Sequence, residues 1–179
     1  MKATGVVRRI DDLGRIVIPK EIRRTLRMRE GDPLEIFTGQ NGEVIFKKYS
    51  IMSELSEFSQ SYADNLYKVS GLHCVIFDSD RIIAYTGSGK KEIMGLSMPP
   101  EIDEMLKQRT SYFKQFASEK SIHPFQRSEY CIIGATPVIS QGDGIGVVAL
   151  LGGENETISD TQKKLLVLTS TFLANHLEI

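Results

Sequence analysis

The spacing of apolar and polar residues changes near residue 50, and the change divides the chain into two parts. In the first part, short apolar runs alternate with polar turns such as "DDLG" and "GQNG", a pattern typical of small β structures. The pattern predicts four strands and one short helix: strands over 4–10, 15–18, 34–38 and 43–48, and a helix over 20–28.

In the second part, apolar residues recur at three- and four-residue steps, which predicts amphipathic helices over 52–71 and 159–179. Either Ser159 or Asp160 is expected to cap the second of these helices. The fold class expected is α+β, with an antiparallel sheet flanked by helices that pack together or form a bundle with another subunit. The remaining elements predicted are a helix over 99–109 and strands over 72–78, 81–87, 129–139 and 144–153.

The first 50 residues hold too few large apolar side chains for a core of their own. A unit of this size buries too little surface to offset the loss of chain entropy. We therefore expect two domains, 1–50 and 51–179, and expect the first to form an intertwined homodimer. A dimer presents each basic side chain twice, which suits a duplex ligand. The shared core expected in the dimer consists of Val6, Ile10, Ile16, Ile18, Leu34, Ile36, Val44 and Phe46.

The formal net charge of −1 conceals a separation of charge between the two parts. Residues 1–50 hold 11 Lys and Arg against 7 Asp and Glu, whereas the remainder holds 11 against 16. Arginine forks match phosphate oxygens and guanine edges, so a local cluster of them indicates a DNA-binding platform. The alternative is a solvated face neutralised by Asp11, Asp12 and Glu21. The cations concerned are Arg8, Arg9, Arg15, Lys20, Arg23 and Arg24, with Arg27 and Arg29 following.

The stretch "TGVVRRIDDLGRIVIPKEIRRTLRMREGDPLEIF", followed by "EVIFKKY", resembles a known family. It is similar to the AbrB-type swapped-hairpin DNA-binding domain of bacterial transition-state regulators, and the similarity extends over roughly the first 50 residues. The same superfamily includes antitoxins. Antitoxins carry a partner-binding tail where this chain has a folded second domain, so the resemblance favours a transcription regulator.

What the resemblance implies is a homodimeric β-barrel with strands exchanged between chains. It binds double-stranded DNA and reads DNA shape and flexibility more than a strict motif. The whole chain resembles regulators of sporulation genes whose second domain is of the GAF type. That domain is expected to sense a signal, to join dimers into a homotetramer through its helices, or both. The implied DNA-binding residues are Arg8, Arg15, Arg23 and Arg24, with Arg9 and Lys20 on phosphates.

GAF modules often bind a small molecule between the sheet and its covering helices and loops. The competing interpretation is that the aromatic residues in this region are ordinary core and that the domain only assembles the protein. No cyclic-nucleotide signature is present, so the sequence predicts a possible small ligand of unknown identity and no cofactor. The candidate lining residues are Tyr85, Thr86, Phe113, Phe116 and Tyr130.

Other chemistry finds little support in the sequence. "TGSGKKE" lacks residues that a phosphate-binding P-loop needs, and "GDGIG" stands between two predicted strands. Cys74, Cys131 and the histidines have no metal-like spacing, so we expect reduced thiols, no metal and no catalytic residues. The remaining alternative is a small-molecule sensor or enzyme that the N-terminal part only dimerises. With no signal peptide or membrane-length apolar run, we expect a cytoplasmic, nucleoid-associated protein.

Overall fold

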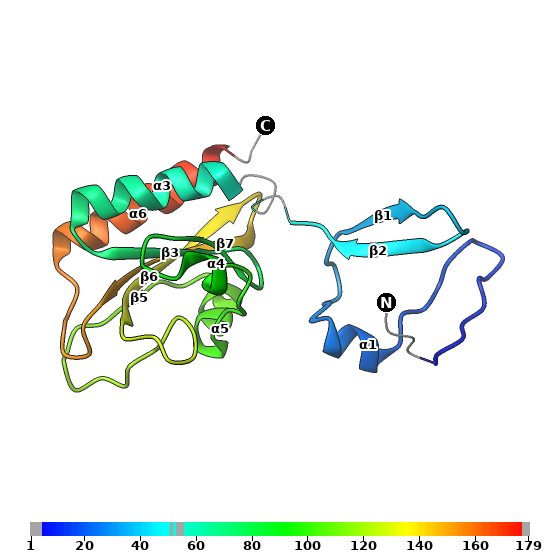
Figure 1. Ribbon diagram of the computed structural model, residues 1–179, viewed down its shortest axis with the longest axis horizontal. Helices are drawn as coiled ribbons and strands as arrows, with labels where there is room; N and C mark the ends of the chain where they lie inside the picture. The colour runs from blue at the N-terminus through cyan, green and yellow to red at the C-terminus, as the bar shows by residue number, and fades with distance from the viewer. Residues whose placement is uncertain (1–4, 51, 53–55, 177–179) are drawn as a thin grey trace. The chain divides into compact units, whose positions relative to one another are not determined.

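A computed structural model of the chain describes residues 5–50, 52 and 56–176, and divides it into two compact units, Met1–Tyr49 and Ser50–Ile179 (Figure 1). In the first unit, β1 (Leu34–Thr38) and β2 (Val44–Lys48) pair as an antiparallel hairpin. Lys48 Nζ lies 3.2 Å from Asp32 Oδ2, so an ion pair joins the end of β2 to the turn before β1. The predicted hairpin of 34–38 and 43–48 is therefore present.

The strands expected over 4–10 and 15–18 do not form within one chain at residues 5–10 and 15–18, and residue 4 lies outside the described residues. Residues 5–10 and 15–18 take part in no strand pairing in the described part of the molecule. A strand needs a neighbouring strand to bind its N–H and C=O groups, and one chain places none beside these residues. The helix α1 (Lys20–Thr25) is also shorter than the expected 20–28, because the chain turns out of the helix after Leu26.

The first unit has apolar surface but no core when only one copy is present. Among residues 5–49, all of which the structure describes, none is buried. Val7 and Val17 keep 85% and 74% of their surface exposed. Of the residues expected in a shared core, Ile18 and Leu34 are half-buried, and the others are exposed, namely Val6, Ile10, Ile16, Ile36, Val44 and Phe46.

The second unit is built on an antiparallel sheet, whose strand order in the described residues is β4-β3-β7-β6-β5. Its longest strands, β6 (Cys131–Ser140) and β7 (Asp143–Gly152), are joined by a tight turn at Gln141 and Gly142. Both turn residues have positive φ, as the common two-residue hairpin turn requires. The sheet is completed by β3 (His73–Phe77), β4 (Ile82–Tyr85) and the short β5 (Tyr112–Phe113).

Helices cover both faces of this sheet. On one face, α3 (Ser56–Ser70) and α6 (Asp160–His176) lie side by side (Figure 1). On the other face lie α5 (Pro100–Gln108) and the short α4 (Lys90–Ile93), which the sequence did not predict. The alternation of side chains along β3 supplies both cores, because Cys74 and Ile76 face α3 and α6 while Val75 and Phe77 face α5.

Polar contacts hold both the start of α6 and the loop that precedes it. Ser159 Oγ accepts a hydrogen bond from the Gln162 N–H at 3.3 Å, and Gln162 Oε1 accepts one from the Ser159 N–H at 2.8 Å. This reciprocal pair is a capping box, so Ser159 and not Asp160 caps the helix. Lys114 is fully buried and its Nζ donates to the Glu154 carbonyl, which ties the loop after β7 to the end of β5. Nothing in the sequence around Lys114 had indicated a buried cation.

The glycine at position 146 sets how closely β7 and β3 approach. A Cβ on Gly146 would lie 2.6 Å from the Phe77 carbonyl oxygen and 3.0 Å from Met52 Cε. Because the nearer atom belongs to the backbone of the sheet, the strands would have to separate. We expect Gly146→Ala to lower the free energy of unfolding of the second unit by about 1–3 kcal/mol, measured by urea denaturation.

Gly153→Ala is the matched control. A Cβ there would meet only Glu156 Oε2, at 3.9 Å, which is an ordinary contact. This variant should stay within about 0.5 kcal/mol of the parent protein. Equal stability of the two variants would show that β7 has room for a side chain at position 146.

Candidate nucleic-acid interface

The carboxylate of Asp11 organises the loop between Asp11 and Arg15. Its Oδ1 accepts hydrogen bonds from the N–H groups of Leu13 at 3.0 Å and Arg15 at 2.7 Å, and its Oδ2 accepts one from Arg15 Nε at 2.8 Å. The Asp11 N–H donates to the Arg15 carbonyl at 3.1 Å, and the Gly14 N–H donates to the Asp11 carbonyl at 3.0 Å. Gly14 has φ +75°, a left-handed conformation that glycine adopts at little cost. Local hydrogen bonds therefore shape this loop without help from a core.

The same contacts act on the acidity of Asp11. The N–H and the guanidinium of Arg15 both donate to the ionised carboxylate, and together they lower the pKa of Asp11 from its ordinary value. The backbone bond is the larger cause. The loop is thus held in its shape by a charged carboxylate at neutral pH.

Arg15 extends from this loop into solvent, and only part of its guanidinium is engaged by Asp11. Its side chain is 69% exposed. Only its Nε bonds to Asp11, and no other group within the described residues binds its two terminal nitrogens. A guanidinium held by its Nε presents the other two nitrogens in a fixed direction, which suits bidentate contact with a phosphate or a base edge.

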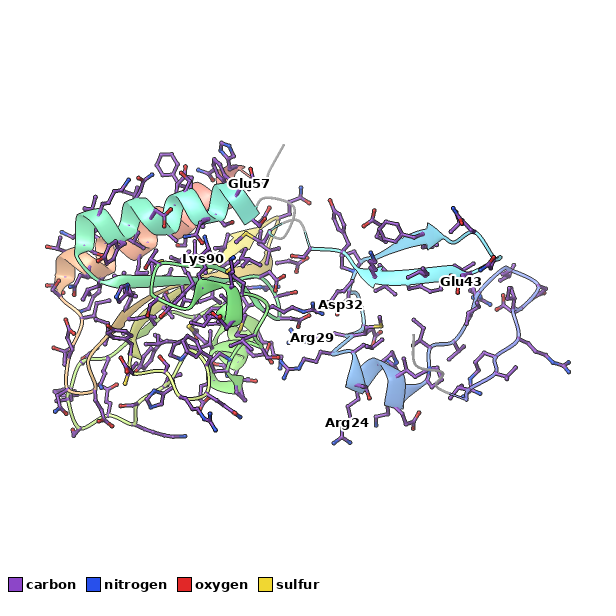
Figure 2. The ribbon with its side chains drawn as sticks, viewed as in Figure 1. Arg24, Arg29, Asp32, Glu43, Glu57 and Lys90 are labelled. Atoms are coloured by element: carbon purple, nitrogen blue, oxygen red, sulfur yellow. The ribbon has the colours of Figure 1, made fainter. Side chains whose placement is uncertain are left out.

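Helix α1 carries the next group of cations. Pro19 precedes the helix and stops the extended segment before it, as the sequence indicated. Lys20, Arg23 and Arg24 are all exposed, and Arg24 points away from the β1–β2 hairpin (Figure 2). Because Lys20 lies three residues before Arg23 and four before Arg24, their side chains share one side of the helix.

The remaining predicted cations lie ahead of the loop. Arg8 and Arg9 are exposed, and Arg8 Nη1 donates to the Val7 carbonyl at 3.2 Å. The alternative of a neutralised face can now be weighed against the contacts. Within the described residues, neither Asp12 nor Glu21 forms an ion pair with any of the six predicted cations, and only Arg15 has a carboxylate partner. The arrangement favours a surface that binds an anion over one that is already neutralised.

In the second unit, the structure divides the residues expected to line a ligand pocket. Tyr85 is buried, and Tyr130 packs against the same core on the face of the sheet that α5 covers. Phe113 packs on the opposite face with the α3 and α6 core, and Phe116 is 66% exposed. The Thr86 hydroxyl accepts a hydrogen bond from the Cys74 N–H at 2.7 Å. The fold thus places Tyr85 and Tyr130 on one face of the sheet but not the whole set, and binding of a small molecule by these residues stays a prediction.

Two further expectations of the sequence concern thiol and metal chemistry. Cys74 and Cys131 are buried free thiols, and burial raises the pKa of the Cys74 thiol far above its ordinary value. In the described residues there is no group of three or more His, Cys, Asp or Glu placed to hold a metal ion. No described helix has the length and apolar character needed to cross a membrane.

Both units are similar to known proteins. Residues 54–178 match the family described as stage V sporulation protein T C-terminal, transcription factor. Stage V sporulation protein T of Bacillus subtilis (strain 168) is 44% identical over 178 residues, which cover 99% of this chain and 99% of that protein. The chain belongs to the stage V sporulation protein T family. Membership in this family of transcription factors confirms the expectation of a regulator and not an enzyme.

The first unit of this family member has its own relatives. Residues 7–51 match the family described as antidote-toxin recognition MazE, bacterial antitoxin. Transition state regulatory protein AbrB of Bacillus subtilis (strain 168) is 44% identical over 71 residues, 40% of this chain and 73% of that protein. The predicted AbrB-type domain is therefore confirmed. The folded second unit separates the chain from antitoxins, as the sequence had indicated.

The second unit of this family member is similar in fold to GAF domains. The GAF domain from an Acinetobacter phosphoenolpyruvate-protein phosphotransferase superposes with a TM-score of 0.58 and 12% identity, covering 73% of this chain and 84% of that chain. At so low an identity the likeness shows the fold alone. The predicted α+β class with a GAF-like second domain is confirmed.

The Asp11 loop makes a prediction about acidity. The pKa of the Asp11 carboxyl, measured by carboxyl NMR titration, should lie below that of the same residue in a short unfolded peptide. Since the folded pKa is the lower one, the ionised carboxylate stabilises the loop above the ordinary pKa, and this stabilisation is lost as pH falls through the lowered value.

The variant Arg15→Ala separates the two causes of the shift. It removes the guanidinium but keeps the N–H, which is the larger cause, so the pKa should rise only part of the way. A complete return to the value in the peptide would mean that the side chain alone holds the carboxylate.

Proposed function

We propose that this chain regulates the transcription of sporulation genes by binding double-stranded DNA, in the cytoplasm and at the nucleoid, through its first unit. The observation that carries the proposal is the set of exposed cations on the Asp11–Arg15 loop, on α1 and ahead of the loop. Within the described residues a single carboxylate offsets them. Phosphates attract such a set whatever the DNA sequence, which is consistent with loose sequence preference. The residues assigned to the contact are Arg8, Arg9, Arg15, Lys20, Arg23 and Arg24.

We further propose that the binding form is a homodimer with a shared N-terminal core. Support comes from the exposed apolar side chains of the first unit, which one copy does not cover. Residues 5–10 and 15–18 have extended apolar runs without strand partners in the described chain, as segments exchanged with a second copy would have. Pairing would bury both the apolar side chains and the open backbone groups.

The double variant Arg15→Ala/Arg23→Ala tests the DNA contact. Both side chains are exposed and neither covers a core, so the fold should persist. We expect the affinity for duplex DNA to fall about tenfold or more at physiological salt, because each arginine bound to DNA is worth about 1–3 kcal/mol. The logarithm of the binding constant should also fall less steeply with the logarithm of salt concentration, by about 0.9 for each phosphate that the variant leaves without its arginine.

Fluorescence anisotropy with a labelled duplex, repeated at several salt concentrations, measures both quantities. Lys90→Ala/Lys91→Ala is the control, since it removes two exposed cations from the second unit. That variant should bind like the parent protein. Full affinity in the arginine variant, with the dimer intact, would overturn the assignment of the surface.

For the second unit we propose a role in joining dimers into a tetramer through α3 and α6. The support is the outer side of α6, where Val167, Leu168 and Phe172 remain exposed although the helix packs on the sheet through Leu166 and Leu173. Apolar residues on the solvent side of a helix that is already packed favour a second helix partner.

The variant Leu168→Glu tests this assembly. Leu168 is 55% exposed, so the change should leave the second unit folded while a buried glutamate opposes helix pairing. Light scattering after size-exclusion chromatography should show a shift from tetramer to dimer. Phe116→Glu makes the same kind of change at an exposed site on a loop and should leave the mass unaltered. An unaltered mass for both variants would exclude this side of α6 as the joint.

A further inference from the structure

Helix α1 ends in a turn that normally requires glycine. The Met28 N–H donates to the Arg23 carbonyl at 2.7 Å, and the Arg27 N–H donates to the Arg24 carbonyl at 3.2 Å. These two bonds form a Schellman motif, in which the residue after the helix cap adopts left-handed backbone. That residue is Arg27, with φ +52°. Glycine takes this conformation without the penalty that a Cβ brings.

Besides Arg27, three side-chain-bearing residues share this conformation in the described part of the chain: Arg109, Arg127 and Gln141. Gln141 and Arg109 have a structural reason for their identity, and Arg127 lies in an exposed turn before β6. Gln141 forms the β6–β7 hairpin turn with Gly142. Arg109 ends α5 with the same kind of turn, φ +55°, and its Nη2 lies 3.4 Å from Asp143 Oδ1. At the end of α5, then, the arginine in the place of glycine has a carboxylate partner on a neighbouring strand.

Arg27 has no such reason within the first unit. It is exposed, and no carboxylate pairs with it among the residues that the structure describes. Its position is four residues after Arg23 and three after Arg24, at the end of the helix that carries both. Arg127 has the same backbone conformation, so strain alone assigns no role. Strain on a cation that continues the basic side of α1 favours a role outside the fold.

We propose that Arg27 is an additional DNA-binding residue, which contacts a phosphate next to those bound by Arg23 and Arg24. The left-handed backbone fixes the direction in which its Cα–Cβ bond leaves the helix end, so the cation extends the basic surface beyond the last turn of α1. A phosphate is the expected partner because a single exposed arginine on a turn, without a groove-filling helix, meets the DNA backbone first. The inference rests on the proposed DNA binding by the first unit.

The variants Arg27→Gly and Arg27→Lys test the proposal in the full-length protein. Arg27→Gly relieves the backbone and should leave the melting temperature unchanged or raise it by a few degrees. The same variant should bind a random-sequence DNA duplex about three- to tenfold more weakly. The slope of the logarithm of the binding constant against the logarithm of salt concentration should be shallower by about 0.9 for each chain that contacts the duplex. Arg27→Lys keeps the charge and should retain most of the affinity.

Opposite effects on stability and affinity distinguish a binding residue from a structural one. Arg109→Gly is the matched control, because it makes the same change in the same kind of turn on α5 and should not alter DNA affinity. Unchanged affinity and salt dependence in Arg27→Gly would overturn the proposal, as would weaker binding accompanied by a lower melting temperature. If Arg27→Gly and Arg15→Ala/Arg23→Ala both bind DNA with full affinity, the proposed DNA-binding surface itself is wrong. If Arg15→Ala/Arg23→Ala binds weakly and Arg27→Gly binds with full affinity, only the role of Arg27 is rejected.

Discussion

The first unit depends on covering apolar side chains that one copy leaves in water. Fixing the backbone of each residue costs about 1–2 kcal/mol, and burying a Val, Ile or Phe side chain returns about 1.5–3 kcal/mol. In residues 5–49 of a single copy no side chain is buried, so that return is mostly missing. The dimer that we propose is therefore a condition for a stable unit. The rigidity of the basic surface depends on it too, since α1 spans only Lys20–Thr25.

Within that constraint, local chemistry decides how the cations are presented. The Asp11 carboxylate binds three donors, two of them from Arg15, and so directs an arginine by bonds made within five residues. Dissolved ions screen the interaction between exposed charges that lie more than about 8 Å apart at physiological salt. A phosphate near this loop therefore responds to the nearby arginines more than to the net charge of −1. This explains how a chain that is almost neutral can carry a surface for a polyanion.

The second unit solves its packing problem within one chain. Its sheet has a core on each face, and the alternation along β3 serves both. Alternation along β5 sends Tyr112 and Phe113 to opposite cores, and so separates Phe113 from Tyr85 and Tyr130. The outer side of α6 is among the apolar surfaces that stay uncovered, since Val167, Leu168 and Phe172 are exposed although the helix packs on the sheet. In a single copy, the first unit therefore exposes both basic and apolar surface to solvent, and the second unit exposes apolar surface.

Sequence alone determined the elements whose signals are local. The periodicities of 52–71 and 159–179 predicted α3 and α6, the apolar runs before and after "SQGD" predicted β6 and β7, and the order of residues in 4–48 indicated the AbrB-type domain. Tertiary structure decided what depends on neighbours distant in the chain. Residues 5–10 and 15–18 become strands only if a partner strand lies beside them. The burial of Lys114 depends on the Glu154 carbonyl, which accepts its hydrogen bond. The left-handed turn at Arg27 depends on how the chain leaves α1. Hydrophobic periodicity records which side of an element is apolar, but not which segment will cover it, and that choice is made only when the whole chain packs.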